Sequence, residues 1–309
     1  MTERNEEPAA APEIEDETPG ASLTDLLLVL MSVIWGVNYA VVKYGTGVIA
    51  PLAYNGVRIT MAAVALFAVV AWTRRPMPSR RDVITLVVLG MLGNGIYQFL
   101  FIEGVARSRA GDAALVLAAS PAFIAILGRM LGVERISVRG AVGIALSLAG
   151  MAFVVYGRQV AGAAGAGATT LAGTLLILAG SVAWSLYSVL LKPRADHLDV
   201  LTISAFTMAG GAIVMIAASA QAIARIDWRT VAPAAWAAMT YSGLFALVIA
   251  YLFWYRGVRV LGPTRTAMYS NLQPVIALGA AWAALGEVPT PWQAVGAGTI
   301  IAGVVLTRT

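Results

Sequence analysis

The chain has 309 residues, of which 59% are hydrophobic and only 12% are charged. Soluble domains carry roughly 25% charged residues, so this composition excludes a soluble globule and indicates a helical membrane protein. The net charge is +5. We expect the Lys and Arg residues to set the orientation of the protein in the membrane rather than to bind nucleic acid. The chain has no cysteine, which excludes thiol catalysis and disulfide bonds.

The chain begins with an acidic segment, residues 1–22, that is rich in Ala and Pro. Such a composition cannot bury enough apolar surface to fold, so we expect a disordered tail. The segment also lacks the basic start and the apolar centre of a signal peptide.

Ten apolar segments follow. A helix needs about 20 apolar residues to cross the hydrocarbon layer. The segments that meet this requirement lie at about 24–44, 51–73, 82–103, 112–132, 137–157, 171–191, 199–220, 232–255, 262–284 and 291–307. We therefore predict an all-α polytopic membrane protein with two five-helix repeats, 23–158 and 171–309, joined by a Gly/Ala-rich linker at 159–170.

The Lys and Arg residues predict the orientation, because cytoplasmic loops are enriched in them. If the N-terminus is cytoplasmic, fourteen of them fall on the cytoplasmic side and six, among them Lys43 and Arg109, fall outside. Both termini are therefore expected in the cytoplasm. Each half has an odd number of helices, so the second half must be inverted relative to the first, as in many transporters.

The two halves also share landmarks at a constant separation of 153 residues. Gly104 matches Gly257, Pro121 matches Pro274, and Glu134 matches Glu287. A run of Gly, Pro and Glu in one frame is evidence of duplication.

Several of these residues resemble a known family. Trp35-Gly36-x-Asn38 in the first span, Pro51 with Arg58 in the second, and the repeated Gly, Pro and Glu series are similar to the drug/metabolite transporter superfamily. Within it, the chain resembles the EamA-type exporters from residue 24 to residue 307. The resemblance implies an inner-membrane exporter with a central cavity for a small-molecule substrate. No nucleotide-binding motif or cluster of metal ligands is apparent, so no cofactor is expected.

Aromatic and amide side chains recur three to four residues apart, so that they share helix faces. Buried amides are costly unless they pair or line water, and the set predicts a cavity with aromatic walls for a small organic solute. The alternative is that they tie helices together. The candidate substrate-binding residues are Trp35, Asn38, Tyr39, Asn94, Tyr97, Gln98, Trp184, Tyr187, Tyr251, Asn271 and Gln273.

Pro121 and Pro274 fall near the middle of the fourth and ninth spans. Each removes a backbone donor and frees a carbonyl one turn earlier, at Leu117 and Ser270. We interpret both as kinks that shape the cavity or act as hinges, although a kink that only aids packing is the alternative.

The ionisable residues are interpreted mainly as structural. Arg58, two turns into the second span, could meet a substrate carboxylate, but extension of its side chain to the nearby surface is preferred. Glu287 is expected to end a helix or form an ion pair in a loop. No Asp, Glu or His lies in the middle of a predicted span, so we expect no proton relay through a buried carboxylate.

These patterns favour a secondary transporter that exports a small metabolite, such as an amino acid, by alternating access. Efflux of hydrophobic drugs and flipping of a lipid-linked head group remain alternatives. An enzyme is disfavoured, because the sole histidine, His197, falls in a loop and no set of metal ligands is apparent. The expected surroundings are membrane lipid, without nucleic acid, and the expected state is a monomer or a homodimer.

Overall fold

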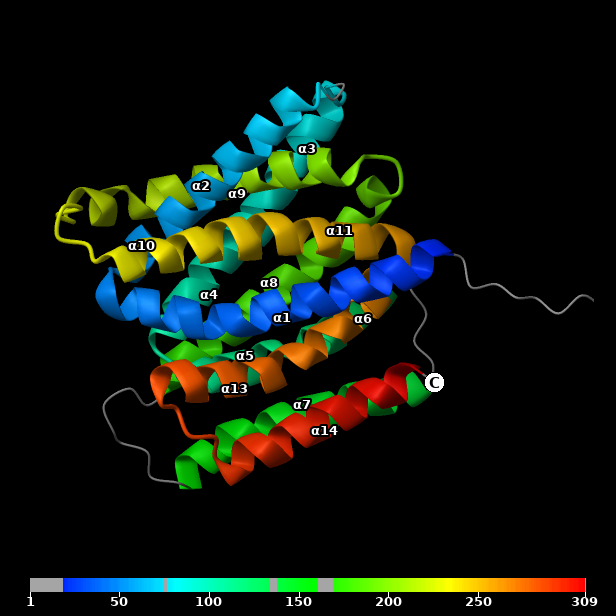
Figure 1. Ribbon diagram of the computed structural model, residues 1–309. Helices are drawn as coiled ribbons and strands as arrows, with labels where there is room; N and C mark the ends of the chain where they lie inside the picture. Colours follow the sequence, from blue (N-terminus) through cyan, green and yellow to red (C-terminus); the bar gives the residue numbers. More distant parts are fainter. Residues whose placement is uncertain (1–18, 75–76, 134–137, 161–168, 309) are drawn as a thin grey trace, which may run out of the picture.

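The computed structural model describes residues 19–74, 77–133, 138–160 and 169–308, and these form helices and short connections without a strand. The all-α prediction is confirmed (Figure 1). Most of the expected acidic tail and the centre of the expected linker lie outside the described residues. The first helix, α1, begins at Pro19 and so includes the last residues of the segment assigned to the tail.

The first half follows the predicted spans, but two of the spans are divided. The third span passes through a π-helical segment, η1, and the fourth is broken before Ser120. Its elements are α1 (Pro19–Val48), α2 (Pro51–Trp72), α3 (Arg80–Gly90), η1 (Met91–Ile96), α4 (Tyr97–Ala106), α5 (Ala110–Leu117), α6 (Ser120–Met130) and α7 (Val138–Val160).

The second half repeats this arrangement, including the π-helical segment and the broken helix. Its elements are α8 (Leu171–Ala195), α9 (Val200–Ala224), α10 (Pro233–Thr240), η2 (Tyr241–Ile249), α11 (Ala250–Leu261), α12 (Pro263–Tyr269), η3 (Ser270–Leu272), α13 (Gln273–Leu285) and α14 (Pro291–Arg308).

Seven of the described helical stretches are long and apolar enough to cross a membrane. With α7, the α12–α13 pair and α14, they follow the ten predicted spans in order. The structural starts also repeat at the separation of 153 residues seen in the sequence: α3 pairs with α10, α4 with α11, α5 with α12, α6 with α13, and α7 with α14.

Proline explains where several of these helices begin. Pro51, Pro233, Pro263 and Pro291 each occupy the first helical position, where the missing N–H costs nothing because no helical carbonyl is available to it. The same rule divides the fourth span, since Pro121 falls in the first turn of α6.

The two halves are inverted and interlocked. The end of α8 meets the start of α3, where Arg194 forms an ion pair with Asp82 at 2.5 Å. At the other end of α8, the Thr170 N–H donates to the Arg107 carbonyl at 2.9 Å. The end of α1 lies near the start of α8, since Lys43 Nζ donates to the Ala106 carbonyl at 3.0 Å. Helix α8 therefore runs opposite to α1, although both open a repeat.

Contacts between the halves follow the same pseudo-symmetry. Helix α1 packs on α11 and α13, while α8 packs on α4 and α6. The last helices of the two halves, α7 and α14, lie against each other (Figure 1). A Cβ on Gly150 would lie 2.8 Å from the Gly296 carbonyl oxygen, so these small residues serve close packing within the chain.

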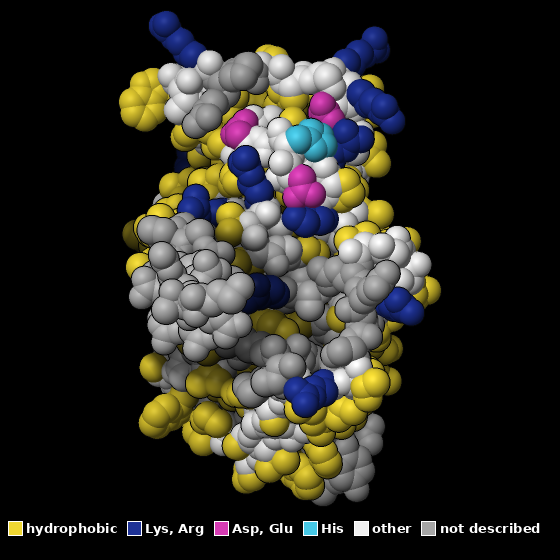
Figure 2. Space-filling model, turned by 90° about the vertical axis from the view of Figure 1, so that its right-hand side faces the viewer, with side chains coloured by type: hydrophobic (Ala, Val, Ile, Leu, Met, Phe, Trp, Pro, Cys, Tyr) yellow, Lys and Arg dark blue, Asp and Glu magenta, His cyan; other side chains and the backbone are white. Residues whose placement is uncertain are grey.

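The start of α1 and the end of α14 lie at the same end of the molecule, on the right in Figure 1. Lys and Arg side chains gather at this end, with fewer acidic ones among them (Figure 2). The helix termini that meet there supply Arg74, Arg80, Arg81, Arg129, Arg139, Lys192, Arg194, Arg259 and Arg265.

Candidate functional site

A cavity lies between the two halves, about midway along the helices. The first half lines it from α1, α2, α4, α5 and α6, and the second half from α8, η2, α11, α12, η3 and α13. The space open to the centres of water molecules is about 50 Å³, which is room for several waters.

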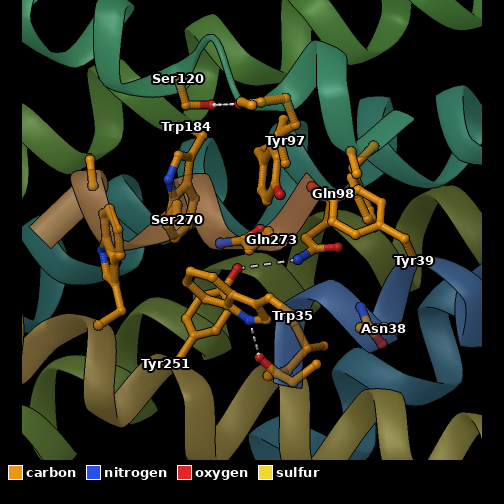
Figure 3. A pocket seen from close by; sticks show the side chains of 18 of the residues that line it. Trp35, Asn38, Tyr39, Tyr97, Gln98, Ser120, Trp184, Tyr251, Ser270 and Gln273 are labelled. Atoms are coloured by element: carbon orange, nitrogen blue, oxygen red, sulfur yellow. Dashed lines mark hydrogen bonds between the residues drawn. The ribbon is translucent and has the colours of Figure 1, made fainter. Parts of the chain in front are cut away.

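Aromatic rings form the walls of this cavity (Figure 3). Trp184 is the hub, with ring centroids 5.1 Å from Tyr97, 5.2 Å from Trp254 and 5.6 Å from Tyr251. Trp35 approaches Trp184 edge-on at 6.0 Å. Rings at these separations pack favourably beyond the area that they bury, and they hold an apolar wall in one shape.

The Trp35 indole is fixed by the π-helical segment of the second half. Its Nε1–H donates to the carbonyl of Ala246, in η2, at 2.8 Å. A π-helix displaces the ordinary i→i−4 bonds, and here a side chain from the other half binds one of its carbonyls. The wall of the cavity is thus tied to a backbone irregularity that both halves share.

Arg58 contradicts the preferred prediction for it, because its side chain does not extend to the surface. It is 0% exposed and lines the cavity. Its Nε donates to Asn55 Oδ1 and one terminal nitrogen to Gln98 Oε1, both at 2.6 Å, and the other donates to Ser242 Oγ. Its guanidinium carbon also lies 5.9 Å from the centre of the Phe101 ring. The long side chain turns inward because neutral oxygens from both halves meet it there.

Further polar groups extend this network around the cavity. Gln98 Nε2 donates to the Tyr251 hydroxyl at 3.2 Å, and the Ser242 hydroxyl donates to Asn38 Oδ1 at 2.7 Å. The Gln273 side chain projects into the space between the aromatic rings (Figure 3). Trp254 Nε1, although buried, has no hydrogen-bond partner within the described part of the chain.

The structure brings most of the predicted site residues together at this cavity. Those that line it are Trp35, Asn38, Tyr39, Tyr97, Gln98, Trp184, Tyr251 and Gln273.

Asn94, Tyr187 and Asn271 lie outside the lining, and their part in binding stays a prediction. The Tyr187 hydroxyl bonds to that of Tyr255 at 2.7 Å, and Asn271 Nδ2 donates to the Met268 carbonyl. Asn94 packs against Gly211 of α9. Its assignment to the same face as Tyr97 assumed a regular α-helix, whereas Asn94 belongs to η1, whose wider turns rotate the face.

Arg58, Phe101, Ser120, Trp254 and Ser270 also line the cavity and were not among the candidate site residues. The signal for Arg58 was available, since an ionisable residue within a membrane span is by default functional. Trp254 follows Tyr251 by three residues and so shares its helix face, whereas for Phe101 no signal separates it from lipid-facing aromatics.

The prolines free the carbonyls that the sequence predicted, and each carbonyl has a new partner. The Ser120 hydroxyl donates to the Leu117 carbonyl at 2.7 Å. In the second half the backbone N–H of Gln273 donates to the Ser270 carbonyl through the 3₁₀ turn of η3. Pro121 lines the cavity, whereas Pro274 does not. A hinge role for either stays a prediction.

One buried carboxylate escaped the sequence analysis, which considered only the middle of each span. Asp112, in the first turn of α5, is 6% exposed. It accepts hydrogen bonds from Thr169 Oγ1 at 2.5 Å and Gln293 Nε2 at 2.8 Å. It does not line the cavity, and nowhere in the described ranges do three His, Asp or Glu side chains gather as metal ligands.

The comparisons with known proteins agree with this architecture. The EamA-like transporter family matches residues 22–156 and again residues 171–309, one match for each half. The chain belongs to the EamA-like transporter family. It is thus a multi-pass membrane transporter and not an enzyme.

The curated relatives that the chain matches are named as transporters, and each match covers most of both chains. The uncharacterized transporter YyaM of Bacillus subtilis is 25% identical, over 90% of this chain and 91% of its own. The uncharacterized inner membrane transporter YedA of Escherichia coli K12 is 27% identical, over 90% and 88%. A probable terminal-alkyne amino-acid exporter of Streptantibioticus cattleyicolor is 28% identical, over 90% and 91%.

One solved crystal structure has the same fold. It aligns with a TM-score of 0.66 and 21% identity, and the match covers 93% of this chain and 98% of the other. At this identity the likeness concerns the fold alone.

Proposed function

We propose that this EamA-family transporter exports a small organic metabolite, an amino acid or a related compound, across the cytoplasmic membrane by alternating access. The observation that carries the proposal is the cavity between the inverted halves, which combines aromatic walls with a few fixed polar groups. Ligand sites for small organic molecules have this composition.

Alternating access is supported by the way the two halves meet. The cavity is lined by both repeats and sits where the α5–α6 and α12–α13 helices are broken. Transporters built from inverted repeats bind their substrates beside such discontinuous helices and expose them by rocking one repeat against the other. Pro121 and Pro274 would then serve as the hinges of this motion.

The proposed direction and location rest on charge and on the relatives. The end that carries the start of α1 is rich in Lys and Arg (Figure 2), and basic loops favour the cytoplasm. We therefore place the protein in the inner membrane, with both termini in the cytoplasm. The relative named as an amino-acid exporter supports export and the class of substrate.

Transport by the purified protein tests this proposal. In proteoliposomes, uptake and counterflow of a panel of labelled amino acids would be measured with and without a pH gradient. We expect saturable exchange of a few amino acids with apolar side chains. Silence across the panel would refute an amino-acid carrier and favour hydrophobic drugs or lipid-linked head groups.

Two substitutions connect this activity to the cavity. Trp35→Ala and Tyr97→Ala remove walls of the site, so we expect transport to fall by about tenfold or more while insertion into the membrane continues. Trp72→Ala is the matched control, because Trp72 is 85% exposed and does not line the cavity. Transport at the normal rate in the first two variants would assign those rings to packing.

A further inference from the structure

The cavity has an unbalanced charge. Among the described residues that line it, Arg58 is the one with a formal charge, and neither Asp nor Glu is present. Each ion pair found in the described ranges involves other residues at the helix ends, so Arg58 has no carboxylate partner there. A buried cation without a counter-ion is costly, and a membrane interior increases that cost.

Neutral neighbours accept hydrogen bonds from only some of the N–H groups of the Arg58 guanidinium. Arginine has five N–H donors, and three hydrogen bonds join Arg58 to Asn55, Gln98 and Ser242. All three acceptors are uncharged, so they orient the group without neutralising it. A carboxylate would bind more strongly than any of them, because hydrogen bonds between ionised groups are shorter and stronger.

The hydrogen-bond directions around Arg58 make the lining rich in donors. Asn38 accepts from Ser242 through its oxygen, which leaves its amide N–H₂ available at the cavity. The Tyr251 hydroxyl accepts from Gln98 and so keeps its own proton to donate. Trp254 Nε1–H is buried with no acceptor in the described part of the protein. Together with Arg58, these groups suit an anion.

A substrate ammonium would find no carboxylate among the described residues of the lining. The Ala246 carbonyl already accepts from Trp35, and the Leu117 carbonyl accepts from Ser120. The nearest buried carboxylate along α5, that of Asp112, is bound to Thr169 and Gln293 outside the lining. The aromatic faces and neutral oxygens, such as that of Gln273, can contact a cation, but no carboxylate among the described lining residues offsets the repulsion from Arg58.

We propose that Arg58 binds the carboxylate of the substrate and that the transporter prefers net-anionic carboxylates with an apolar body, ahead of zwitterions and well ahead of cations. This inference rests on the proposed function and narrows its substrate class. The carboxylate displaces one of the neutral acceptors of Arg58. Because these come from both halves, with Ser242 in η2 and Gln98 in α4, binding loosens a contact between the halves.

Three compounds with one benzyl body separate these charges. Phenylalanine is the zwitterion, 3-phenylpropanoate lacks its ammonium group, and 2-phenylethylamine lacks its carboxylate. Calorimetric titration of the full-length protein in lipid nanodiscs gives the three affinities. We expect 3-phenylpropanoate to bind more tightly than phenylalanine and about tenfold or more tightly than 2-phenylethylamine. Equal affinities, tighter binding of phenylalanine than of 3-phenylpropanoate, a preference for the amine, or no binding by any of the three would overturn the proposal.

Variants then assign the preference to one residue. Arg58→Gln should abolish the difference between 3-phenylpropanoate and 2-phenylethylamine, while Arg58→Lys should retain part of it, since lysine keeps the charge but loses the planar fork. Arg225→Gln, an exposed arginine at the end of α9, should leave the order unchanged. Should Arg58→Gln fail to fold, Arg58→Lys decides: an order identical to that of the unaltered protein, at identical affinities, refutes the role of the guanidinium.

The transport assay separates this inference from the function that it refines. Exchange of amino acids without any preference for anions would leave the transporter proposal standing and remove the role of Arg58. If the three compounds bind in the expected order but transport is absent, the role of Arg58 stands and the proposed transport function falls.

Discussion

The two broken helices, α5–α6 and α12–α13, occupy equivalent places in the two repeats, yet they resolve the same problem differently. In both, a proline leaves a carbonyl without its helical donor. The Leu117 carbonyl is satisfied by the Ser120 side chain, whereas the Ser270 carbonyl is satisfied by the backbone of Gln273. Ser120 and Gln273 are themselves equivalent, since both open the second part of their helix. Both positions line the cavity, but the side chain binds a backbone carbonyl in the first half and is free of that role in the second.

The helix crossings differ between the halves in a similar way. A Cβ on Gly90, where α3 crosses α9, would lie 2.0 Å from the Thr207 carbonyl oxygen. On Gly243, the equivalent residue in η2, a Cβ would meet the Arg58 carbonyl oxygen at 3.1 Å. The first crossing requires glycine, because the backbone that it meets cannot move aside, while the second leaves nearly enough room for a methyl group.

The largest expected effect is a difference in stability between alanine variants at these two crossings. Gly90→Ala should lower the free energy of unfolding by about 1–3 kcal/mol or more, because the added methyl group overlaps rigid backbone. Gly243→Ala should be nearly neutral, since the gain in helix propensity over glycine, about 1 kcal/mol, offsets a mild crowding. Thermal unfolding of the two purified variants in the same detergent measures both. Similar losses in the two would mean that the crossings are alike.

The end opposite the chain termini offers a second comparison. There Glu287 accepts from the Ala110 N–H at 3.2 Å and lies 3.8 Å from the Arg109 guanidinium, which confirms the ion pair expected for it. It thereby joins the loop after α13 to the start of α5. The equivalent of Ala110 is Pro263, which has no N–H, so the same bond cannot form in the other half. We expect this contact to hold the cavity closed at that end.

The Glu287→Ala variant tests whether this contact holds the cavity closed at that end. Losing a charged hydrogen bond costs about 1–2 kcal/mol, which corresponds to roughly fivefold or more in the population that is open at this end. The chain has no cysteine, so Ala118→Cys, in the cavity lining, introduces a single thiol. Its labelling by a membrane-impermeant maleimide from that side should accelerate about fivefold.

Glu103→Ala provides the control for this measurement, because Glu103 pairs with Arg107 within one helix at the same end. It should leave the labelling rate unchanged. An equal acceleration in both variants would point to a general effect of charge at this end.

The sequence predicted the fold because hydropathy and duplication both operate over long stretches. The spans, the inversion and the two prolines follow from them, and eight of the candidate residues do line the cavity. The local departures were not predictable. The π-helical turns of η1 and η2 carry no residue signature, and they move Asn94 off the face that Tyr97 shares. Arg58 was misjudged because the oxygens that hold it inside, those of Gln98 and Ser242, come from distant parts of the chain.

The smallest expected effects separate Ser120 from Gln273. Ser120→Ala removes the hydroxyl that binds the Leu117 carbonyl and the Ser181 hydroxyl, so it should cost about 1 kcal/mol of stability with little change in the affinity for substrate. Gln273→Ala should leave stability nearly unchanged, because the backbone N–H of that residue still satisfies the Ser270 carbonyl, and it should weaken substrate binding severalfold. Unfolding and binding measured on both variants test the pair. If Ser120→Ala weakened binding as much as Gln273→Ala did, both positions would act on the substrate, and the two repeats would share their chemistry as closely as they share their helices.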